Sequence, residues 1–570
     1  MRRFLLFITS LFFLWGLVAC TQTSVPPTAV STQVLPTSSA TAVPSHTPIP
    51  TPTPVLPTPT PTPIPDVALT ANNIFVYPAA AIYAGDRLTI QVMPTIPPSI
   101  RPESVTVHLL INGEETAVST VNNRNIAGQP MALFQWTAIA QPGTHTIQVI
   151  LDQDNQLLPQ LRHSTHNQAS RTITVQEATA RSRQETDATW VRAESNCCIV
   201  YAASGTAAYR DLPQLLPRIE TAVQTTIDRL DETPLRKIEV YFVDRIIGQG
   251  GYAGSAMVIS YSDRPYNGGQ LDQMLRHEAT HVIDRQFAPR RIPFLAEGVA
   301  VWSSDGHYKP ENIEERTAAL VTLDYYIPLD QLINQFYPVQ HEIGYLQAAG
   351  FVQYLVNQKG WGRFRTFYSN VTAADAPTLA EAVDLNLQIY YDTTLAALEA
   401  DWLDHLQSIQ PSSHTLADLQ TTLHYYDTMR YYQMHYDPTA HFLNAWLPFP
   451  NEVREQGNPA DLNRRPNSET HLVLETMFLT ADEALQVGDF NRAAVLIDSI
   501  NRAINNDGAF LDPLAINYLN IVRTLQNVGY IPQKITITGN RAAVLATPSG
   551  QTTLIQLNLQ LRGRNWFLTS

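Results

Sequence analysis

Residues 21–65 consist mainly of Pro, Thr, Ser, Val and Ala, and they end in TPTPTPIP. A segment of this composition has too few large apolar side chains to bury a core, and it favours the extended polyproline conformation. We therefore expect a tether with a reach on the order of 140 Å, at about 3.1 Å per residue. The chain has 570 residues, too many for one hydrophobic core, so several domains should follow the tether.

The N-terminus, at 1–20, has the pattern of an export signal. Arg2 and Arg3 precede an apolar run at 4–18, which leads into LVAC at 17–20. A charged start, an apolar middle and a small residue at the cut are the marks of a signal peptide. The last four residues resemble the lipobox of bacterial lipoproteins. The alternative is an uncleaved membrane anchor, but the run is short against the roughly 20 apolar residues that a spanning helix needs.

The lipobox resemblance implies cleavage before Cys20 and lipidation of its thiol. The rest of the chain would then be exported and anchored, through the lipid at Cys20, to the outer face of the cytoplasmic membrane or to the cell surface. Either interpretation of the N-terminus exports the chain, because no second apolar stretch is long enough to span a membrane.

Residues 66–180 alternate apolar and polar side chains. RLTIQVMPT (87–95), SVTVHLLING (104–113) and SRTITVQ (170–176) are separated by Gly, Pro, Asn and Asp, which predicts an antiparallel β-sandwich. The run from Trp136 to Asn167 resembles the second half of a bacterial immunoglobulin-like module of the CARDB type. Its acidic residue and paired asparagines are degraded here, so the resemblance implies the fold and no binding function. We expect a spacer domain.

Residues 185–410 mix strand and helix patterns. KIEVYFVD (237–244) and MVISYS (257–262) predict strands, and from about Gln270 the apolar residues recur with a helical period. The Gly-rich segment between the strands, IIGQGGYAGSA (246–256), matches no phosphate-binding pattern, because no Gly-Lys-Ser/Thr follows it. This part of the chain therefore predicts an α+β domain.

The helical stretch contains the motif His277-Glu278-Ala279-Thr280-His281. On a helix, His277 and His281 share one face, so both imidazoles can reach one metal ion. Glu278 lies beside them, where it can take a proton from metal-bound water. The alternative is a helix with two exposed histidines and an ion-paired glutamate. Arg276 and Arg285 flank the motif, and we expect them on its solvated face.

A zinc site needs a third protein ligand, and Glu297 in PFLAEGVAVW (293–302) is the candidate. Pro293 is well placed to begin a helix, and that helix would bring Glu297 towards the histidines if it ran back along the first. Asp284 is a further candidate, but a partner of a ligand or a surface charge suits it better. Asp305 and His307 lie beyond the second helix.

HExxH followed by a Glu on the next helix resembles the gluzincin metallopeptidases. The order of the strand pair, the motif, PFLAEGVAVW and YLQAAGFVQYLVNQKG (345–360) resembles the peptidase MA-like domains of bacterial exported proteins, and ALEADWLDHL (397–406), with Trp402 buried, resembles their closing helix. The metzincin pattern is excluded, because Phe287 stands where that class has a His. The resemblance implies one Zn²⁺ per chain, held by His277, His281 and Glu297.

The resemblance also implies peptide-bond hydrolysis, with Glu278 as the general base and acid. The oxyanion needs one more hydrogen-bond donor, which in related enzymes is often a Tyr or His. Tyr345 is the first candidate, although a packed aromatic residue explains it equally well, and His341 and His307 compete with it. MVISYS is expected to pair with the extended substrate as an edge strand.

Residues 411–527 predict helices, two of them joined at Gly488-Asp489, and residues 528–570 predict a β-meander that needs the helices as a packing surface. The series Tyr425, Tyr426, Tyr431, Tyr432 and Tyr436 recurs near helical spacing, which favours packing over a sugar-binding platform. We therefore expect a multidomain α+β protein, with a β-sandwich, a gluzincin-like domain, a helical segment and a small sheet.

The adjacent Cys197 and Cys198 favour two small buried residues on a strand, and the alternative is a strained vicinal disulfide. Neighbouring Cα atoms lie about 3.8 Å apart, closer than ordinary disulfide geometry allows. With Cys20, they are the only cysteines in the chain, so this is not a disulfide scaffold.

The net charge of −14 argues against nucleic acid as a partner, because phosphate binding needs a basic face. The favoured hypothesis is an extracytoplasmic, membrane-tethered zinc peptidase that cleaves peptides or proteins. A rival hypothesis is a binding or scaffold lipoprotein with a relic peptidase fold, and another is a peptidase that acts only on itself or on one partner. The sequence does not indicate the oligomeric state.

Overall fold

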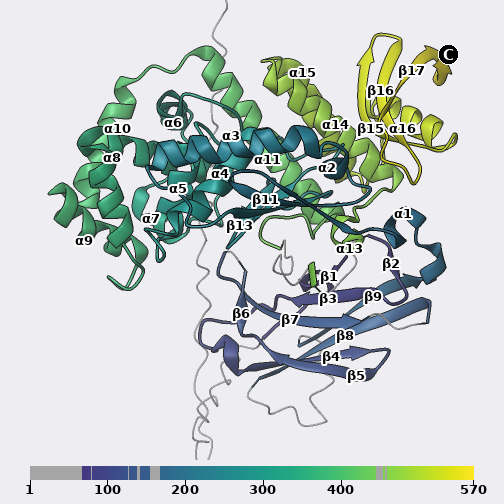
Figure 1. The fold of residues 1–570 in the computed structure, drawn as a ribbon, viewed down its shortest axis with the longest axis horizontal. Coiled ribbons are helices and arrows are strands. Elements are labelled where there is room, and N and C mark those ends of the chain that lie inside the picture. Colours follow the sequence, from purple (N-terminus) through teal and green to yellow (C-terminus); the bar gives the residue numbers. More distant parts are fainter. Residues whose placement is uncertain are drawn as a thin grey trace, which may run out of the picture. The chain divides into compact units, whose positions relative to one another are not determined.

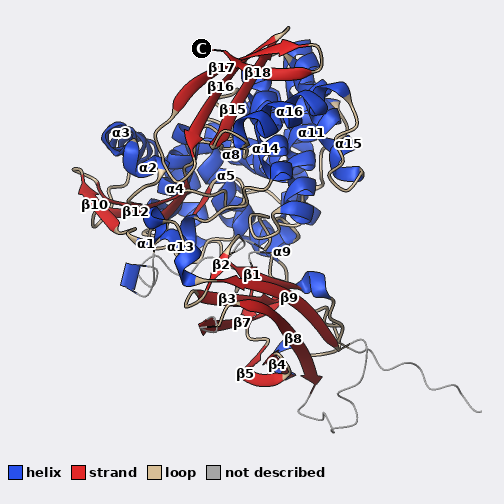
Figure 2. Ribbon diagram, turned by 90° about the vertical axis from the view of Figure 1, so that its right-hand side faces the viewer, coloured by secondary structure: helices blue, strands red, loops and turns tan. Residues whose placement is uncertain are grey.

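The computed structural model describes residues 67–569, apart from 79, 126, 138–140, 154–166, 445–453 and 456–458. The predicted signal peptide with Cys20 and the predicted tether lie outside these residues. The described chain is a mixed α+β protein with several sheets, one of them a small antiparallel sheet at the C-terminal end (Figures 1 and 2). Among the described residues, no helix combines the length and the apolar character that a membrane crossing requires.

Two sheets at the N-terminal end of the described chain enclose one core. The first has the order β1 (Ile74–Tyr77), β3 (Arg87–Val92), β7 (Pro130–Thr137) and β6 (Asn123–Arg124). The second has the order β2 (Ile82–Tyr83), β9 (Gln168–Gln176), β8 (Gly143–Gln153), β4 (Val105–Ile111) and β5 (Glu114–Thr120). The strands pair antiparallel apart from β2 and β9, which are parallel. Ile90, Val107 and Val149 are fully buried in the shared core.

A third sheet, the five-stranded central sheet, follows the short helix α1 (Arg183–Thr186). Its order is β10 (Trp190–Glu194), β11 (Cys198–Ala203), β12 (Ile238–Val243), β14 (Met257–Ser260) and β13 (Gly251–Ala253). β11, β12 and β14 run parallel, whereas β10 and β13 are antiparallel edge strands. One face of the sheet carries Val200, Val240 and Ile259 into the main hydrophobic core.

The expectation that MVISYS forms the edge of this sheet is wrong, because β14 lies between β12 and β13. The edge strand β13 comes from the Gly-rich segment that the sequence had indicated as a loop. A Cβ at Gly251 would lie 2.6 Å from the carbonyl oxygen of Val258. The missing side chain therefore lets this segment approach β14 closely enough to pair with it.

Helices cover the core face of the central sheet and extend beyond it (Figure 1). In chain order they are α2 (Ala207–Arg210), α3 (Leu212–Leu230), α4 (Leu271–Asp284), α5 (Pro293–Ser303), α6 (Ile313–Thr322), α7 (Leu329–Asn334), α8 (His341–Asn370), α9 (Leu379–Tyr391) and α10 (Leu395–Ser408). Gly360 interrupts α8 with φ 77° and ψ 162°, a conformation that glycine adopts without steric cost. Trp402 of α10 is buried, as expected.

The C-terminal part contains α11 (Ser413–Tyr436), α13 (Ala460–Asn463), α14 (Glu469–Gln486), α15 (Phe490–Asn505) and α16 (Pro513–Gln526). The meander of β15 (Tyr530–Thr538), β16 (Arg541–Pro548), β17 (Ile555–Arg562) and β18 (Asn565–Thr569) follows, and it shares a core with α14, α15 and α16. α11 contributes Leu419 and Leu423 to the main core but Tyr425 and Tyr432 to this second core. One helix thus belongs to both cores.

The structure joins Cys197 and Cys198 in a disulfide at the start of β11. The prediction of two small buried residues is therefore wrong in its main point, although Cys198 is fully buried. Cys197 precedes the strand, outside the regular pleat, and adjacent residues on a regular strand would point to opposite faces.

Candidate metal centre

The helix α4 presents both histidines of the motif to one cavity. Leu275, Ala279 and Ile283 are fully buried in the main core, which fixes the rotation of the helix about its axis. Residues one turn apart share a face, and His277 and His281 point away from this apolar stripe into the cavity. Helical periodicity and packing therefore position the two imidazoles together.

The next helix, α5, supplies Glu297. Pro293 occupies its first turn, where the missing N–H costs nothing. The helix is buried over almost its whole length, and Gly298 allows it to approach α8, because a Cβ there would lie 2.7 Å from the carbonyl oxygen of Ala348. This close packing holds Glu297 against the face of α4 that bears the histidines.

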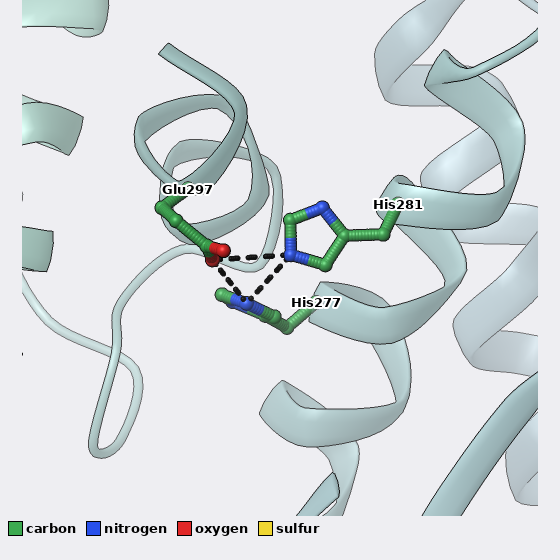
Figure 3. A group of neighbouring side chains, drawn as sticks. All are labelled: His277, His281 and Glu297. Atoms are coloured by element: carbon green, nitrogen blue, oxygen red, sulfur yellow. Dashed lines mark hydrogen bonds and ion pairs between the residues drawn. The ribbon is translucent and has the colours of Figure 1, made fainter. Parts of the chain in front are cut away.

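The three side chains converge on one point (Figure 3). His277 Nε2, His281 Nε2 and Glu297 Oε2 form a triangle with sides of 3.1 Å. Three ligands of one tetrahedral zinc ion, each at about 2.0–2.1 Å from the metal, lie about 3.3 Å apart. Donor types and spacing thus fit a zinc ion with an open position, and the three predicted ligands are brought together.

The charges of this group are strongly coupled. Burial alone would raise the pKa of Glu297, but the two histidines outweigh it and hold that pKa well below its usual range. Burial lowers the pKa of His281, whereas the hydrogen bond to Glu297 and the nearby Glu278 outweigh burial at His277 and raise its pKa. A metal requires both imidazoles to be neutral, so binding competes with protonation of His277.

Glu278 faces the same cavity but lies outside the ligand triangle. Its Oε2 is buried and makes no hydrogen bond among the described residues. Burial is the largest influence on its carboxyl group and raises its pKa to about 7. A carboxylate with an unused oxygen and a pKa near neutrality suits a group that accepts and returns a proton.

Tyr337 also belongs to the candidate site, although no sequence pattern predicted it. Its hydroxyl donates to Glu297 Oε1 at 3.1 Å, and it lines the cavity. The residue precedes α8 in a segment without regular structure, so no periodicity connected it with the site. Its only sequence signal is an aromatic residue with a hydroxyl downstream of Glu297, a signal that Tyr345 shares.

Tyr345 also lies in the cavity wall, with its ring packed among histidines. Its ring centroid is 4.9 Å from that of His307, 4.8 Å from that of His341 and 6.1 Å from that of His277. Within the described residues, its hydroxyl makes no hydrogen bond to a member of the triangle. The sequence-based role of Tyr345 as an oxyanion donor stays a prediction.

The two histidines that competed with Tyr345 have other partners. His307 Nδ1 lies 2.7 Å from Glu342 Oε2, and His341 Nδ1 pairs with Gln249 Oε1. Burial holds the pKa of His341 well below its usual range. Both rings line the cavity, so both stay candidates for contact with a substrate.

The acidic alternatives to Glu297 lie elsewhere. Asp284 is fully buried, accepts a hydrogen bond of 2.6 Å from the Tyr368 hydroxyl, and pairs with Arg291 Nε at 3.3 Å. Asp305 pairs with Arg276 at 3.0 Å. Neither aspartate belongs to the ligand group, and Arg276 is ion-paired on the outer side of α4, away from the cavity.

The cavity has a volume of about 360 Å³ and is framed by four parts of the chain. β13 and the segment before it form one wall, α4 and α5 form the floor, the start of α8 forms a second wall, and Phe442, after α11, closes one end. The ring of Phe442 meets that of His341 edge to face at 3.8 Å between centroids. The free backbone edge of β13 thus borders the cavity.

No family model matches the sequence, and no curated protein matches it. Solved structures that resemble it include the CARDB domain of a Pyrococcus furiosus protein, which is 20% identical and has a TM-score of 0.15, with 20% of this chain and 88% of that chain covered. They also include an aminopeptidase N family protein from Idiomarina loihiensis, at 10% identity and a TM-score of 0.28, with 62% of this chain and 78% of that chain covered. An M1 zinc metallopeptidase from Deinococcus radiodurans is 11% identical with a TM-score of 0.28, and the match covers 61% of this chain and 95% of that chain.

Proposed function

We propose that this protein is a zinc-dependent peptidase that hydrolyses peptide bonds outside the cytoplasm. The observation that carries the proposal is the triangle of His277, His281 and Glu297 donor atoms at 3.1 Å, with the unpaired carboxylate of Glu278 in the same cavity. Two imidazoles and one carboxylate that leave a position open form the donor set of catalytic zinc sites. When bound, zinc supplies Lewis acidity that activates water and polarises a carbonyl group.

The side chains divide the remaining work. Glu278 takes a proton from the attacking water at its free Oε2 and delivers it to the leaving nitrogen, so the peptide bond breaks without a charged amide leaving group. The Tyr337 hydroxyl carries one proton, which it donates to Glu297 Oε1 in the structure. When the oxyanion develops on the substrate carbonyl, the hydroxyl turns from Glu297 and donates to the oxyanion instead. The position of this hydroxyl beside a member of the ligand triangle supports Tyr337 over Tyr345 as the donor.

The proposal is tested first by metal content. We would purify the wild-type protein with the variants His281→Ala and Glu278→Gln, and measure zinc per chain by mass spectrometry. We expect about one zinc in the wild type and in Glu278→Gln, and a loss of zinc in His281→Ala, because three protein ligands are needed to hold the ion. His405→Ala is the matched control, since His405 pairs with Glu314 on the surface, away from the cavity.

Peptide hydrolysis is tested next, with zinc-loaded Glu278→Gln as the inactive control. Cleavage by the wild type that disappears in Glu278→Gln, with zinc retained, supports the enzyme over the scaffold lipoprotein. A wild-type protein that stays free of metal after zinc is supplied would rule out the peptidase and favour a binding role.

The location is a separate proposal, which rests on the lipobox-like LVAC at 17–20. We propose a diacylated Cys20 that anchors the chain to the envelope of a bacterial cell. Metabolic labelling with a palmitate analogue should mark the wild type and not Cys20→Ser, and Cys20→Ser should keep its uncleaved leader and therefore have a higher mass than the processed chain. Cys197→Ser is the control for labelling of another thiol.

A further inference from the structure

The free edge of β13 ends at an arginine. In the pairing with β14, Ser260 N–H donates to Gly250 O at 2.7 Å and Gly254 N–H donates to Ala256 O at 2.9 Å. Hydrogen bonding alternates along an antiparallel strand, so the backbone groups of Gly251 and Ala253 face the open edge. Arg285 Nη2 donates to the Ala253 carbonyl oxygen at 3.0 Å. This bond places the guanidinium at the end of the open edge of β13.

Arg285 is exposed and lines the cavity, although the sequence indicated only a solvated helix face. A guanidinium carries five N–H donors in a planar fork, and the bond to Ala253 occupies one of its two terminal nitrogens. In the part of the chain that the structure describes, no carboxylate lies within ion-pair distance of Arg285. The guanidinium is thus fixed in position by Ala253, and its positive charge has no carboxylate partner among the described residues.

The other charged side chains that line the cavity already have partners or a proposed role in the chemistry. Arg291 pairs with Asp284 and donates to the His281 carbonyl oxygen at 3.2 Å. Among the described lining residues, Glu278 and Glu297 are the only carboxylates, and both belong to the proposed chemistry. The wall therefore offers no free anion for the α-ammonium of a substrate, and one free cation for a carboxylate.

We propose that Arg285 determines specificity by binding a carboxylate of the substrate beside the scissile bond. The carboxylate is either an Asp or Glu side chain or the C-terminal carboxylate of the peptide, since a guanidinium binds both in the same bidentate way. This inference rests on the proposed peptidase function and names its substrate class. The substrate backbone pairs with Gly251, and its acidic group reaches the guanidinium where the strand edge ends.

The test uses matched peptides that carry Glu, Gln or Lys at each of the positions flanking the scissile bond, each with a free or an amidated C-terminus. For the zinc-loaded wild type, we expect kcat/KM to be about tenfold higher with Glu than with Gln, the effect of one hydrogen-bonded charge pair at a partly exposed site. If kcat/KM depends on Glu, the carboxylate bound by Arg285 is that of the side chain. If amidation abolishes the preference, the bound carboxylate is that of the C-terminus.

Variants of Arg285 separate specificity from a structural effect on β13. Arg285→Gln should reduce the Glu-to-Gln ratio to about one, Arg285→Lys should keep part of it, and Arg285→Glu should favour Lys peptides. A change in strand geometry alone would lower kcat/KM for all peptides by the same factor and leave the Glu-to-Gln ratio of kcat/KM unchanged. Arg290→Gln is the matched control, because Arg290 is exposed in the same loop region and does not line the cavity.

A wild type that prefers neither Glu over Gln nor the free over the amidated C-terminus overturns the inference and leaves the peptidase standing. A preference that is unchanged in Arg285→Gln overturns it as well. Fluorescence anisotropy with the zinc-loaded Glu278→Gln variant measures the affinities for the same Glu and Gln peptides without cleavage. If the wild type cleaves no peptide, that binding ratio still decides the role of Arg285, while the peptidase proposal fails by itself.

Discussion

Tyr337 donates its hydroxyl to Glu297 Oε1, whereas Oε2 of the same carboxylate faces His277 and His281 at 3.1 Å. The hydrogen bond thus holds the carboxylate so that a single oxygen points into the ligand triangle. Partners that orient a metal ligand in this way contribute to metal affinity and to activity. The proposed donation to the oxyanion uses the same single proton, so the two roles of Tyr337 act one after the other, and zinc affinity and kcat report them separately.

We predict that Tyr337→Phe weakens zinc binding about tenfold. With zinc at saturation, kcat should still fall about 10²-fold, because a donor to the oxyanion is lost. Chelator competition measures the first effect, and peptide hydrolysis at saturating zinc measures the second. Tyr345→Phe is the control, since a phenylalanine keeps the ring packing among the histidines. A loss of kcat in Tyr345→Phe and none in Tyr337→Phe would return the donor role to Tyr345.

Gly298 provides a second test, because it sets the distance between α5 and α8. A Cβ at this position would lie 2.7 Å from the Ala348 carbonyl oxygen and 2.9 Å from Val352 Cγ2, so a side chain must push the two helices apart. We predict that Gly298→Ala lowers the free energy of unfolding by about 1–3 kcal/mol. Zinc affinity should fall as well, since the neighbouring Glu297 moves with α5.

Thermal unfolding and chelator competition measure these two effects. The control is Gly362→Ala in the second half of α8, where a Cβ meets no atom within 4 Å and where alanine favours a helix over glycine by about 1 kcal/mol. An unchanged zinc affinity in Gly298→Ala, with the protein folded, would contradict the coupling between the helix contact and the site.

The three candidate metal ligands could be predicted from the sequence because local rules bring them together. His277 and His281 lie one helical turn apart, and Pro293 marks the start of the helix that bears Glu297. Tyr337 could not be found in this way, because it acts from a segment without regular structure whose path depends on the packing of α7 and α8. Residues that tertiary structure alone brings to a site leave no periodic signal.

The edge strand shows the same limit. MVISYS has the stronger strand pattern, but the short β13, which contains Gly251, lies outside it and forms the edge. Similarly, α11 was expected to begin a separate helical region, yet Leu423 packs in the main core and Tyr425 in the second. Its apolar side chains surround the helix, as is typical of a helix buried on more than one side, so its periodicity did not reveal both contacts.

A buried ion cluster joins α11 to the helices behind the metal centre. Arg316 of α6 pairs with Glu311 and with Glu342 at 3.0 Å and with Asp418 of α11 at 3.2 Å. Its side chain is 3% exposed. Lys309 also pairs with Asp418, at 2.8 Å, but Glu311 and Glu342 lose their only arginine partner among the described residues when Arg316 is removed. We therefore predict that Arg316→Met lowers the free energy of unfolding by about 3–5 kcal/mol.

Urea unfolding of Arg316→Met checks this value. Glu314→Gln, on the same helix, is the control, because Glu314 forms an ion pair with His405 in which both side chains are about 40% exposed, and such pairs contribute about 1 kcal/mol or less. Equal midpoints for the two variants would show that the buried cluster does not stabilise the junction of α6 and α11.

The titration of Asp482, in α14, should make the stability of the protein depend on pH. Burial raises the pKa of its carboxyl group to about 6, against an ordinary value of 3.8, although hydrogen bonds from the Tyr308 hydroxyl and from Gln486 act in the opposite direction. The folded state therefore holds this proton more tightly than the unfolded state. The resulting stability is fully present below about pH 4, is lost as the pH rises to about 6, and amounts to at most about 3 kcal/mol.

Asp482→Asn should remove this dependence, because an amide can still accept the hydrogen bond from Tyr308 and carries no proton to lose. We predict that the difference in unfolding free energy between Asp482→Asn and the wild type changes in favour of the variant between pH 4 and pH 7, measured by urea unfolding at both values. Asp498→Asn is the control, since Asp498 is exposed on α15. A constant difference between Asp482→Asn and the wild type across this range would show that the carboxyl group of Asp482 titrates alike in the folded and unfolded chains.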